Sequence, residues 1–374
     1  MSDERPAALA GLRVIDLATV LAGPSCARYL ADFGADVIKV ERPDGDTWRN
    51  VGWCDPADGV SLWWKLTNRN KRLISLDLKN ADDNALLLQL ADEAHVLVEN
   101  FRPGTLERLG LGPDVLHARN PTLVIVRVTG FGQDGPYRDR AGFASLAEAM
   151  TGYASINGDA DGPPMLPPIA LTDEITGLAA AFAAMVALRS GVGQVVDVNL
   201  IESMFQFMGP LVAAHRLLGY NQPRAGSAIP YTVPRGIYQC ADGRHVVVST
   251  SADSVAARVM NLIGVGDDPR FATFASRVEH RDECEQLLRE WIGVRNAADV
   301  IDAFHAAEAA IAPVLSMAEV DADEHMVARG NVIEVDGVPM AGPIARLSAT
   351  PGAVRWTGRE HDADGAEVRT NGWR

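Results

Sequence analysis

The chain has 374 residues, of which 47% are hydrophobic and 22% are charged, a composition typical of a globular protein with one large or two moderate domains. Its formal net charge of −15 argues against nucleic acid or an anionic membrane as the main partner, since both bind basic surfaces. A small anionic ligand is still compatible with this charge, because it needs only a local basic patch.

The four cysteines and the first residues bear on compartment and metal binding. The cysteines lie far apart, with no CxxC pair and no Cys/His spacing that would ligate a metal. The opening MSDERPAALAG is polar and acidic, unlike a signal peptide. We therefore predict a reduced, cytoplasmic setting, with no disulfide framework and no metal site.

The first half of the sequence alternates β-rich apolar runs with segments of helical spacing. Such alternation indicates βαβ units, hence an α/β fold with a Rossmann-like, mostly parallel sheet covered by helices. A large domain over residues 1–205, completed by residues 330–374, would hold this sheet. The predicted strands are 13–17, 36–40, 72–78, 95–100 and 123–130.

The second half indicates a smaller domain. Residues 178–190 have the pattern of a buried helix, and 193–200 that of another strand. A linker over 206–230 is rich in Pro and Gly towards its end, and a hairpin around the turn ADG opens an α+β domain over 231–320. Residues 321–374 are predicted to return to the large domain.

The common nucleotide and hydrolase motifs are absent: there is no GxGxxG, GxxxxGK[ST], HExxH or GxSxG. The segment VLAGPSCA does follow the first strand. We expect Gly23 and Pro24 to form a turn there and Ser25 to cap the next helix, at the sheet edge where ligands gather. A plain strand-to-helix connection is the alternative.

The heptapeptide LTDEITG, residues 171–177, places an acidic pair between a proline-rich approach and an alanine-rich helical run. Asp173 is predicted to cap that helix, because a carboxylate accepts hydrogen bonds from the unpaired N–H groups of a first turn. Apolar neighbours would also keep water from it, so it could serve as a nucleophile. The two roles are compatible.

Several blocks in the same order resemble the class III CoA-transferases, a family that includes formyl-CoA transferase and carnitine CoA-transferase and shares its fold with α-methylacyl-CoA racemase. LTDEITG falls where that family has its catalytic aspartate. The blocks that carry the resemblance are residues 9–46, 68–79, 96–112, 129–142, 171–177 and 191–203.

The resemblance implies that Asp173 attacks an acyl-CoA thioester and carries CoA to a free carboxylic acid through an aspartyl anhydride and an aspartyl-CoA thioester. Coenzyme A is then a substrate, with no tightly bound cofactor, and an interlocked homodimer is expected. The positions that match CoA- or substrate-lining residues of the family are Leu21, Ala22, Arg42, Leu76, Lys79, Asn100, Phe101, Arg108 and Arg140.

Two departures from the family bear on the substrate. Phe143 stands where the racemase branch has a histidine, and phenyl cannot abstract a proton, which argues against racemisation. Leu21 replaces the glutamine of the formate and oxalate enzymes, and residues 224–236 lack their glycine run. Leu21 is compatible with a larger, more apolar acid. An acyl-CoA racemase or epimerase and a non-catalytic CoA-binding homologue remain the alternatives.

Overall fold

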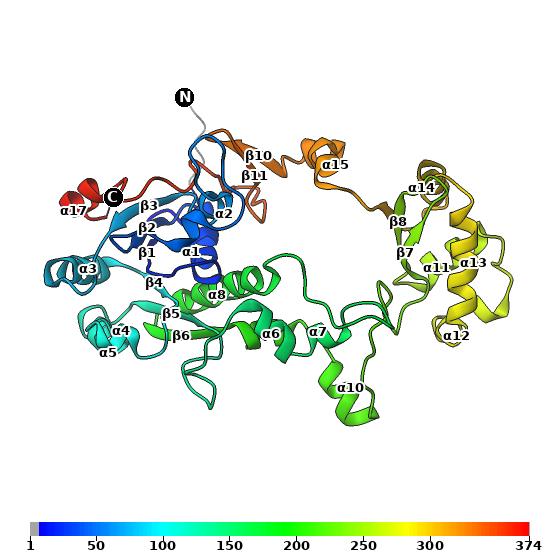
Figure 1. Ribbon diagram of the computed structural model, residues 1–374, viewed down its shortest axis with the longest axis horizontal. Coiled ribbons are helices and arrows are strands. Elements are labelled where there is room, and N and C mark those ends of the chain that lie inside the picture. Colours follow the sequence, from blue (N-terminus) through cyan, green and yellow to red (C-terminus); the bar gives the residue numbers. More distant parts are fainter. Residues whose placement is uncertain (1–6, 374) are drawn as a thin grey trace. The chain divides into compact units, whose positions relative to one another are not determined.

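The computed structural model describes residues 7–373 of the chain (Figure 1). Contacts within it define two compact units. The first comprises the residues up to Thr151, Pro167–Gly209 and the residues from His325 onward. The second comprises Gly152–Leu166 and Pro210–Glu324.

A six-stranded parallel sheet forms the centre of the first unit, in the order β3-β2-β1-β4-β5-β6. The α/β prediction and its parallel sheet are confirmed. Register aligns Ile15 with Ile38 on one side and with Leu97 on the other. The strands are β1 (Arg13–Asp16), β2 (Asp36–Glu41), β3 (Lys71–Ser75), β4 (Val96–Glu99), β5 (Val124–Thr129) and β6 (Gln194–Asn199).

Helices cover both faces of this sheet, because successive strand residues point to opposite sides. Val14 and Val96 pack with α1 (Ala22–Asp32) and α8 (Leu171–Ser190). Ile15 and Leu97 pack on the other face, with residues of α3 (Ala81–Glu93), α5 (Pro113–Arg119) and α17 (Gly365–Asn371). Both cores are apolar and fully buried, which is what a parallel sheet requires.

Shorter elements complete the first unit, and the C-terminal segment runs beside β3. Asp364 accepts a hydrogen bond from the backbone N–H of Leu73 (2.9 Å), and Asp362 accepts one from that of Ser75 (2.7 Å). The shorter elements are η1 (Thr47–Asn50), α2 (Leu62–Thr67), α4 (Thr105–Arg108), α6 (Ala144–Met150), α9 (Leu200–Gln206), β10 (Val332–Val335) and β11 (Val338–Ala341), with α16 (Glu324–Ala328) at the boundary.

The second unit is α+β, as predicted, and contains the predicted hairpin. β7 (Arg235–Gln239) pairs antiparallel with β8 (His245–Ser249), which pairs with β9 (Ile311–Pro313). Tyr238 and Phe304 lie in its core. Its other elements are α7 (Tyr153–Ile156), α10 (Leu211–Leu218), α11 (Asp253–Leu262), η2 (Pro269–Phe271), α12 (Phe274–Glu279), α13 (Arg281–Gly293), α14 (Ala297–Ala306) and α15 (Met317–Ala322).

Two predicted helix caps are wrong. α1 begins at Ala22, so Gly23, Pro24 and Ser25 are helical and form neither a separate turn nor a side-chain cap. α8 begins at Leu171, and its N-cap Ala170 offers no side-chain hydrogen bond. Asp173 is therefore the third residue inside the first turn and does not cap the helix, although it remains near the positive end of the helix dipole.

Helix α8 is also less buried than its sequence suggested. It spans 20 residues, long and apolar enough to cross a membrane by length and composition, but core helices of soluble proteins pass the same test. Ala180, Ala184 and Ala187 of one face are buried in the core that α8 shares with α1 and the sheet. Phe182 on another face is 70% exposed. The helix is thus buried on one side only.

Candidate active site

The order of the strands places a crevice between the carboxyl ends of β1 and β4. In open parallel sheets ligands bind where the direction of strand succession reverses, and here that point lies between these two strands. Asn100, just after β4, joins the two strand ends. It accepts a hydrogen bond from the backbone N–H of Thr19 (2.8 Å) and donates one to the carbonyl of Thr19 (2.7 Å).

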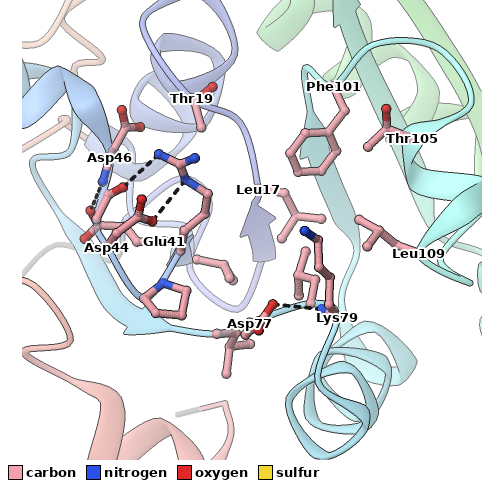
Figure 2. Close-up of a pocket in the computed structure, with 16 residues that line it drawn as sticks. Leu17, Thr19, Glu41, Asp44, Asp46, Asp77, Lys79, Phe101, Thr105 and Leu109 are labelled. Atoms are coloured by element: carbon pink, nitrogen blue, oxygen red, sulfur yellow. Dashed lines mark hydrogen bonds and ion pairs between the residues drawn. The ribbon is translucent and has the colours of Figure 1, made fainter.

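A cavity of about 540 Å³ opens at this edge of the sheet (Figure 2). Its walls come from the segments that follow β1, β2, β3 and β4. Four of the residues predicted to contact CoA line it: Arg42, Leu76, Lys79 and Phe101. Figure 2 shows the Lys79 side chain extending into the cavity between Leu17 and Leu109.

The two cations of the cavity are only weakly engaged. Arg42 is exposed, and its guanidinium lies 3.5 Å from the Asp44 carboxylate and 3.4 Å from the carbonyl of Gly45. Within residues 7–373, no side-chain or backbone acceptor binds the Lys79 ammonium. By contrast, the buried Glu41 carboxylate is taken up by Arg49 through two hydrogen bonds of 2.9 and 2.7 Å. The cavity therefore combines two available cations with apolar walls and with four carboxylates, Glu41, Asp44, Asp46 and Asp77. Its cations suit a phosphorylated ligand.

A second hollow of about 470 Å³ shares Lys79 and Leu109 with the first. Arg108 lines it, held by a 2.7 Å hydrogen bond to the hydroxyl of Thr105. The structure therefore brings Arg42, Lys79 and Arg108 to the same edge of the sheet.

The other predicted residues do not line these hollows. Leu21 and Ala22 are buried at the start of α1, and Asn100 acts through the strand ends described above. Arg140 lies in the loop after β5, with its guanidinium 3.6 Å from the ring centroid of Tyr137. Asp173 lies at the start of α8.

Asp173 is half-buried and has an acidic environment. Among the described residues, none donates a hydrogen bond to its carboxylate. Burial, with the charges of Glu174 and Glu148 adding to it, raises the pKa of Asp173 to about 6. Glu148, on α6, accepts a hydrogen bond from the hydroxyl of the adjacent Thr172 (2.9 Å). The result is a carboxylate without a bound cation, more basic than an ordinary aspartate and still mostly ionised at neutral pH.

A close contact between helices brings the first turns of α8 against the start of α1. A Cβ placed on Gly177, one turn after Asp173, would lie 2.9 Å from the carbonyl oxygen of Ala22 and 2.7 Å from the Cβ of Ser25. Glycine is thus required for α8 to approach the start of α1 this closely. The first turns of both helices stand together beside the carboxyl end of β1.

Sequence reasoning missed the polar residues that hold these two helices. Glu174 binds Ser25, Arg28 and Tyr29 of α1, and buried Lys71 binds the carbonyl of Pro24 (2.8 Å). The spacing i, i+3, i+4 of the three α1 residues is the one signal that could have marked them as a single polar face.

Comparison with known proteins adds the family. The sequence model of CoA-transferase family III matches residues 9–363. The chain belongs to this family. It is 40% identical to a succinyl-CoA–D-citramalate CoA-transferase of Chloroflexus aurantiacus over 99% of this chain and 96% of that one. The β subunit of a succinyl-CoA–L-malate CoA-transferase of the same organism is 38% identical over 94% and 90%.

A solved structure agrees with these relatives. The crystal structure of a CAIB/BAIF family protein from Brucella suis matches with a TM-score of 0.86 and 32% identity, covering 98% of this chain and 99% of that one. The resemblance predicted from the sequence blocks is confirmed. The protein is a class III CoA-transferase and acts on CoA thioesters.

Proposed function

We propose that this CoA-transferase moves CoA from succinyl-CoA to a second dicarboxylic acid, with Asp173 as the nucleophile. The observation that carries the proposal is the state of the Asp173 carboxylate. It is half-buried, bound by no cation among the described residues, and has a pKa raised to about 6. Such a group keeps its lone pairs free and is more nucleophilic than an ordinary carboxylate.

The reaction would proceed in four attacks. The Asp173 carboxylate attacks the thioester carbonyl and expels CoA thiolate, giving a mixed anhydride. The thiolate then attacks the aspartyl carbonyl, releases succinate and forms an aspartyl-CoA thioester. The acceptor carboxylate attacks that thioester, and the freed thiolate finally attacks the acceptor's acyl carbon and regenerates Asp173. No proton is gained or lost overall, so the reaction needs no dedicated acid or base.

We assign the CoA moiety to the cavity at the carboxyl ends of β1 to β4. Arg42, Lys79 and Arg108 would bind its phosphates, since available cations at one edge match several anionic groups. Leu76 and Phe101 would offer apolar contact to its nucleotide end. The remaining members of the predicted set, which we assign to the thioester end, are Leu21, Ala22, Asn100 and Arg140.

The choice of substrates comes from the names of the relatives. Both Chloroflexus relatives use succinyl-CoA by name, with citramalate or malate as the partner acid. This differs from the larger, more apolar acid with which Leu21 is compatible, so a test panel must contain both kinds. Phe143, directly before α6, offers no proton acceptor to a racemase reaction.

A cytoplasmic homodimer completes the proposal. Large apolar side chains on α8 and on the end of α9 face solvent in the single chain: Leu178, Phe182 and Val186 along one face of α8, and Phe205 and Phe207 beyond it. Exposed apolar surface of this kind is typical of a protein interface. We assign the partner as a second copy of the chain, interlocked with the first.

Exchange of label tests the covalent mechanism without knowledge of the acceptor. Enzyme, succinyl-CoA and isotopically labelled succinate are incubated alone, and label is expected to enter the thioester. Asp173→Asn should abolish this exchange, and omission of enzyme provides the background. Failure of succinyl-CoA to exchange with labelled succinate, or deuterium uptake from D₂O at the α-carbon, would contradict the proposal and favour the non-catalytic or racemase alternatives.

A further inference from the structure

The carboxylate next to Asp173 in sequence is bound by three donors from a single helix. Glu174 Oε1 accepts a hydrogen bond from the hydroxyl of Ser25 (3.0 Å). Its Oε2 accepts from Arg28 Nη2 (2.8 Å) and from the hydroxyl of Tyr29 (2.9 Å). These three residues occupy one face of α1, so Glu174 fastens the first turn of α8 to the first two turns of α1.

These three hydrogen bonds, which we call the Glu174 clamp, lie where water is partly excluded, and this strengthens them. The side chain of Arg28 is 8% exposed and that of Glu174 is 28% exposed. Burial, followed by the charge of Glu174, raises the pKa of Tyr29 to about 12, so its hydroxyl remains a donor at physiological pH. The close approach at Gly177 reinforces the contact one turn later.

We infer that Glu174 is a positioning residue for the transfer reaction, and that its clamp on Ser25, Arg28 and Tyr29 fixes the Asp173 carboxylate for attack on the thioester. The inference rests on the proposed role of Asp173. Holding a nucleophile within a fraction of an ångström of its attack geometry is a large part of catalysis, because the reacting atoms must start near contact.

Glu174 also places a negative charge next to Asp173 and keeps the Arg28 guanidinium away from the Asp173 oxygens. Arg28 is paired with Glu174 and not with Asp173, so its guanidinium does not bind the attacking oxygens. Glu148 of α6 adds a second negative charge near Asp173. Glu202 of α9 acts instead on Asp197 of β6. Removal of the Glu174 charge, which also leaves Arg28 unpaired, should lower the pKa of Asp173.

The substitution Glu174→Gln tests the inference, because it keeps the shape and removes the charge. We expect kcat for CoA transfer to fall by about 10- to 100-fold while KM for succinyl-CoA changes less than about twofold. The acid limb of the pH–rate profile should move to lower pH. Tyr29→Phe, which removes a single hydrogen bond, should give a smaller loss of kcat in the same direction and serves if Glu174→Gln does not fold.

Asp36→Asn is the matched control. Asp36 likewise pairs with a buried arginine, Arg72, through hydrogen bonds of 2.9 and 2.6 Å. The carboxylate is 22% exposed and the arginine 2% exposed, at the amino end of β2, away from the cavity. Both Asp36→Asn and Glu174→Gln break a buried ion pair and should lower the melting temperature. Asp36→Asn should leave kcat and the pH profile unchanged. Wild-type kcat in both Glu174→Gln and Tyr29→Phe would overturn the inference, as would equal loss of kcat in Asp36→Asn.

The outcome for Asp173 separates the two claims. If Asp173→Asn abolishes transfer while Glu174→Gln leaves kcat and the pH profile unchanged, only the positioning role fails. If Asp173→Asn retains full activity, the proposed nucleophile itself is wrong, and the inference falls with it.

Discussion

The nucleophilic role that we propose for Asp173 requires a carboxylate that is basic and not bound by a cation, and these requirements conflict with stability. Burial and two neighbouring carboxylates raise its pKa to about 6, from an ordinary value near 3.8. At neutral pH the Asp173 carboxylate is therefore ionised in surroundings that disfavour its charge relative to water. Functional residues commonly impose such a cost on the fold.

Replacement of Asp173 by Asn is therefore expected to stabilise the protein. Because the folded pKa lies above the unfolded one, ionisation of Asp173 destabilises the fold above about pH 6, and this cost disappears below about pH 4. The gain at neutral pH should be about 1–2 kcal/mol, after allowance for partial solvent screening. Thermal unfolding at neutral pH and near pH 4 measures it. An equal or lower melting temperature at neutral pH would contradict the raised pKa.

The rate of transfer should depend on the same group. In the proposed mechanism only ionised Asp173 can attack, so kcat/KM is expected to fall as the pH decreases through about 6, about tenfold for each further unit. Initial rates across this range, with a pH-stable thioester substrate, measure the profile. An acid limb near pH 4 would indicate an ordinary carboxylate.

At the level of secondary structure, the start of α1 packs too closely on its neighbours to admit a side chain at Gly23. A Cβ on Gly23 would lie 2.3 Å from the Cβ of Ala18 and 3.6 Å from that of Asn100. Buried Lys71 donates hydrogen bonds to Asp16 and to the carbonyl of Pro24, both at 2.8 Å, and Lys39 donates one to the carbonyl of Ala18. Two buried lysines therefore hold the backbone on either side of Gly23, at Ala18 and at Pro24.

Substitution Gly23→Ala should displace the turn, because two Cβ atoms cannot approach to 2.3 Å. We expect a loss of about 1–3 kcal/mol in the free energy of unfolding and a rise in KM for the acyl-CoA. The double variant Ala18→Gly/Gly23→Ala removes the clash and should recover most of both losses. Chemical denaturation and initial rates measure the two effects, and full stability of Gly23→Ala alone would contradict the account.

The strands were predictable, whereas the caps of α1 and α8 were not. The run DVIKV carries β-branched residues on both faces, Val37 on one and Ile38 and Val40 on the other, and the strand at Asp36–Glu41 lies within one residue of its prediction. The start of α8 at Leu171 followed no capping signal, because Ala170 has no side chain that can cap. The Glu174 clamp joins residues 146 positions apart, a distance over which local patterns carry no information.

For the molecule as a whole, the exposed apolar face of α8 indicates a protein interface. Phe182 is 70% exposed and Phe207 is 67% exposed, values that are costly for large aromatic side chains in water. The first unit is also built from three separate stretches of chain, with the second unit inserted between them. Chain crossings of this kind are compatible with an interlocked dimer.

We therefore expect the protein to have the mass of two chains in solution, down to nanomolar concentration. Phe182→Glu should introduce a charge into the interface and give monomers or aggregates, whereas Glu290→Lys on the exposed surface of α13 should not. Light scattering coupled to size-exclusion chromatography measures both. A monodisperse wild-type monomer would contradict the dimer.

The most direct test of the central claim is mass spectrometry of the protein after brief incubation with succinyl-CoA. We predict a covalent CoA adduct on the peptide that contains Asp173, lost on treatment with hydroxylamine and absent from Asp173→Asn. An adduct on a different residue, or transfer activity by Asp173→Asn at the wild-type rate, would contradict it.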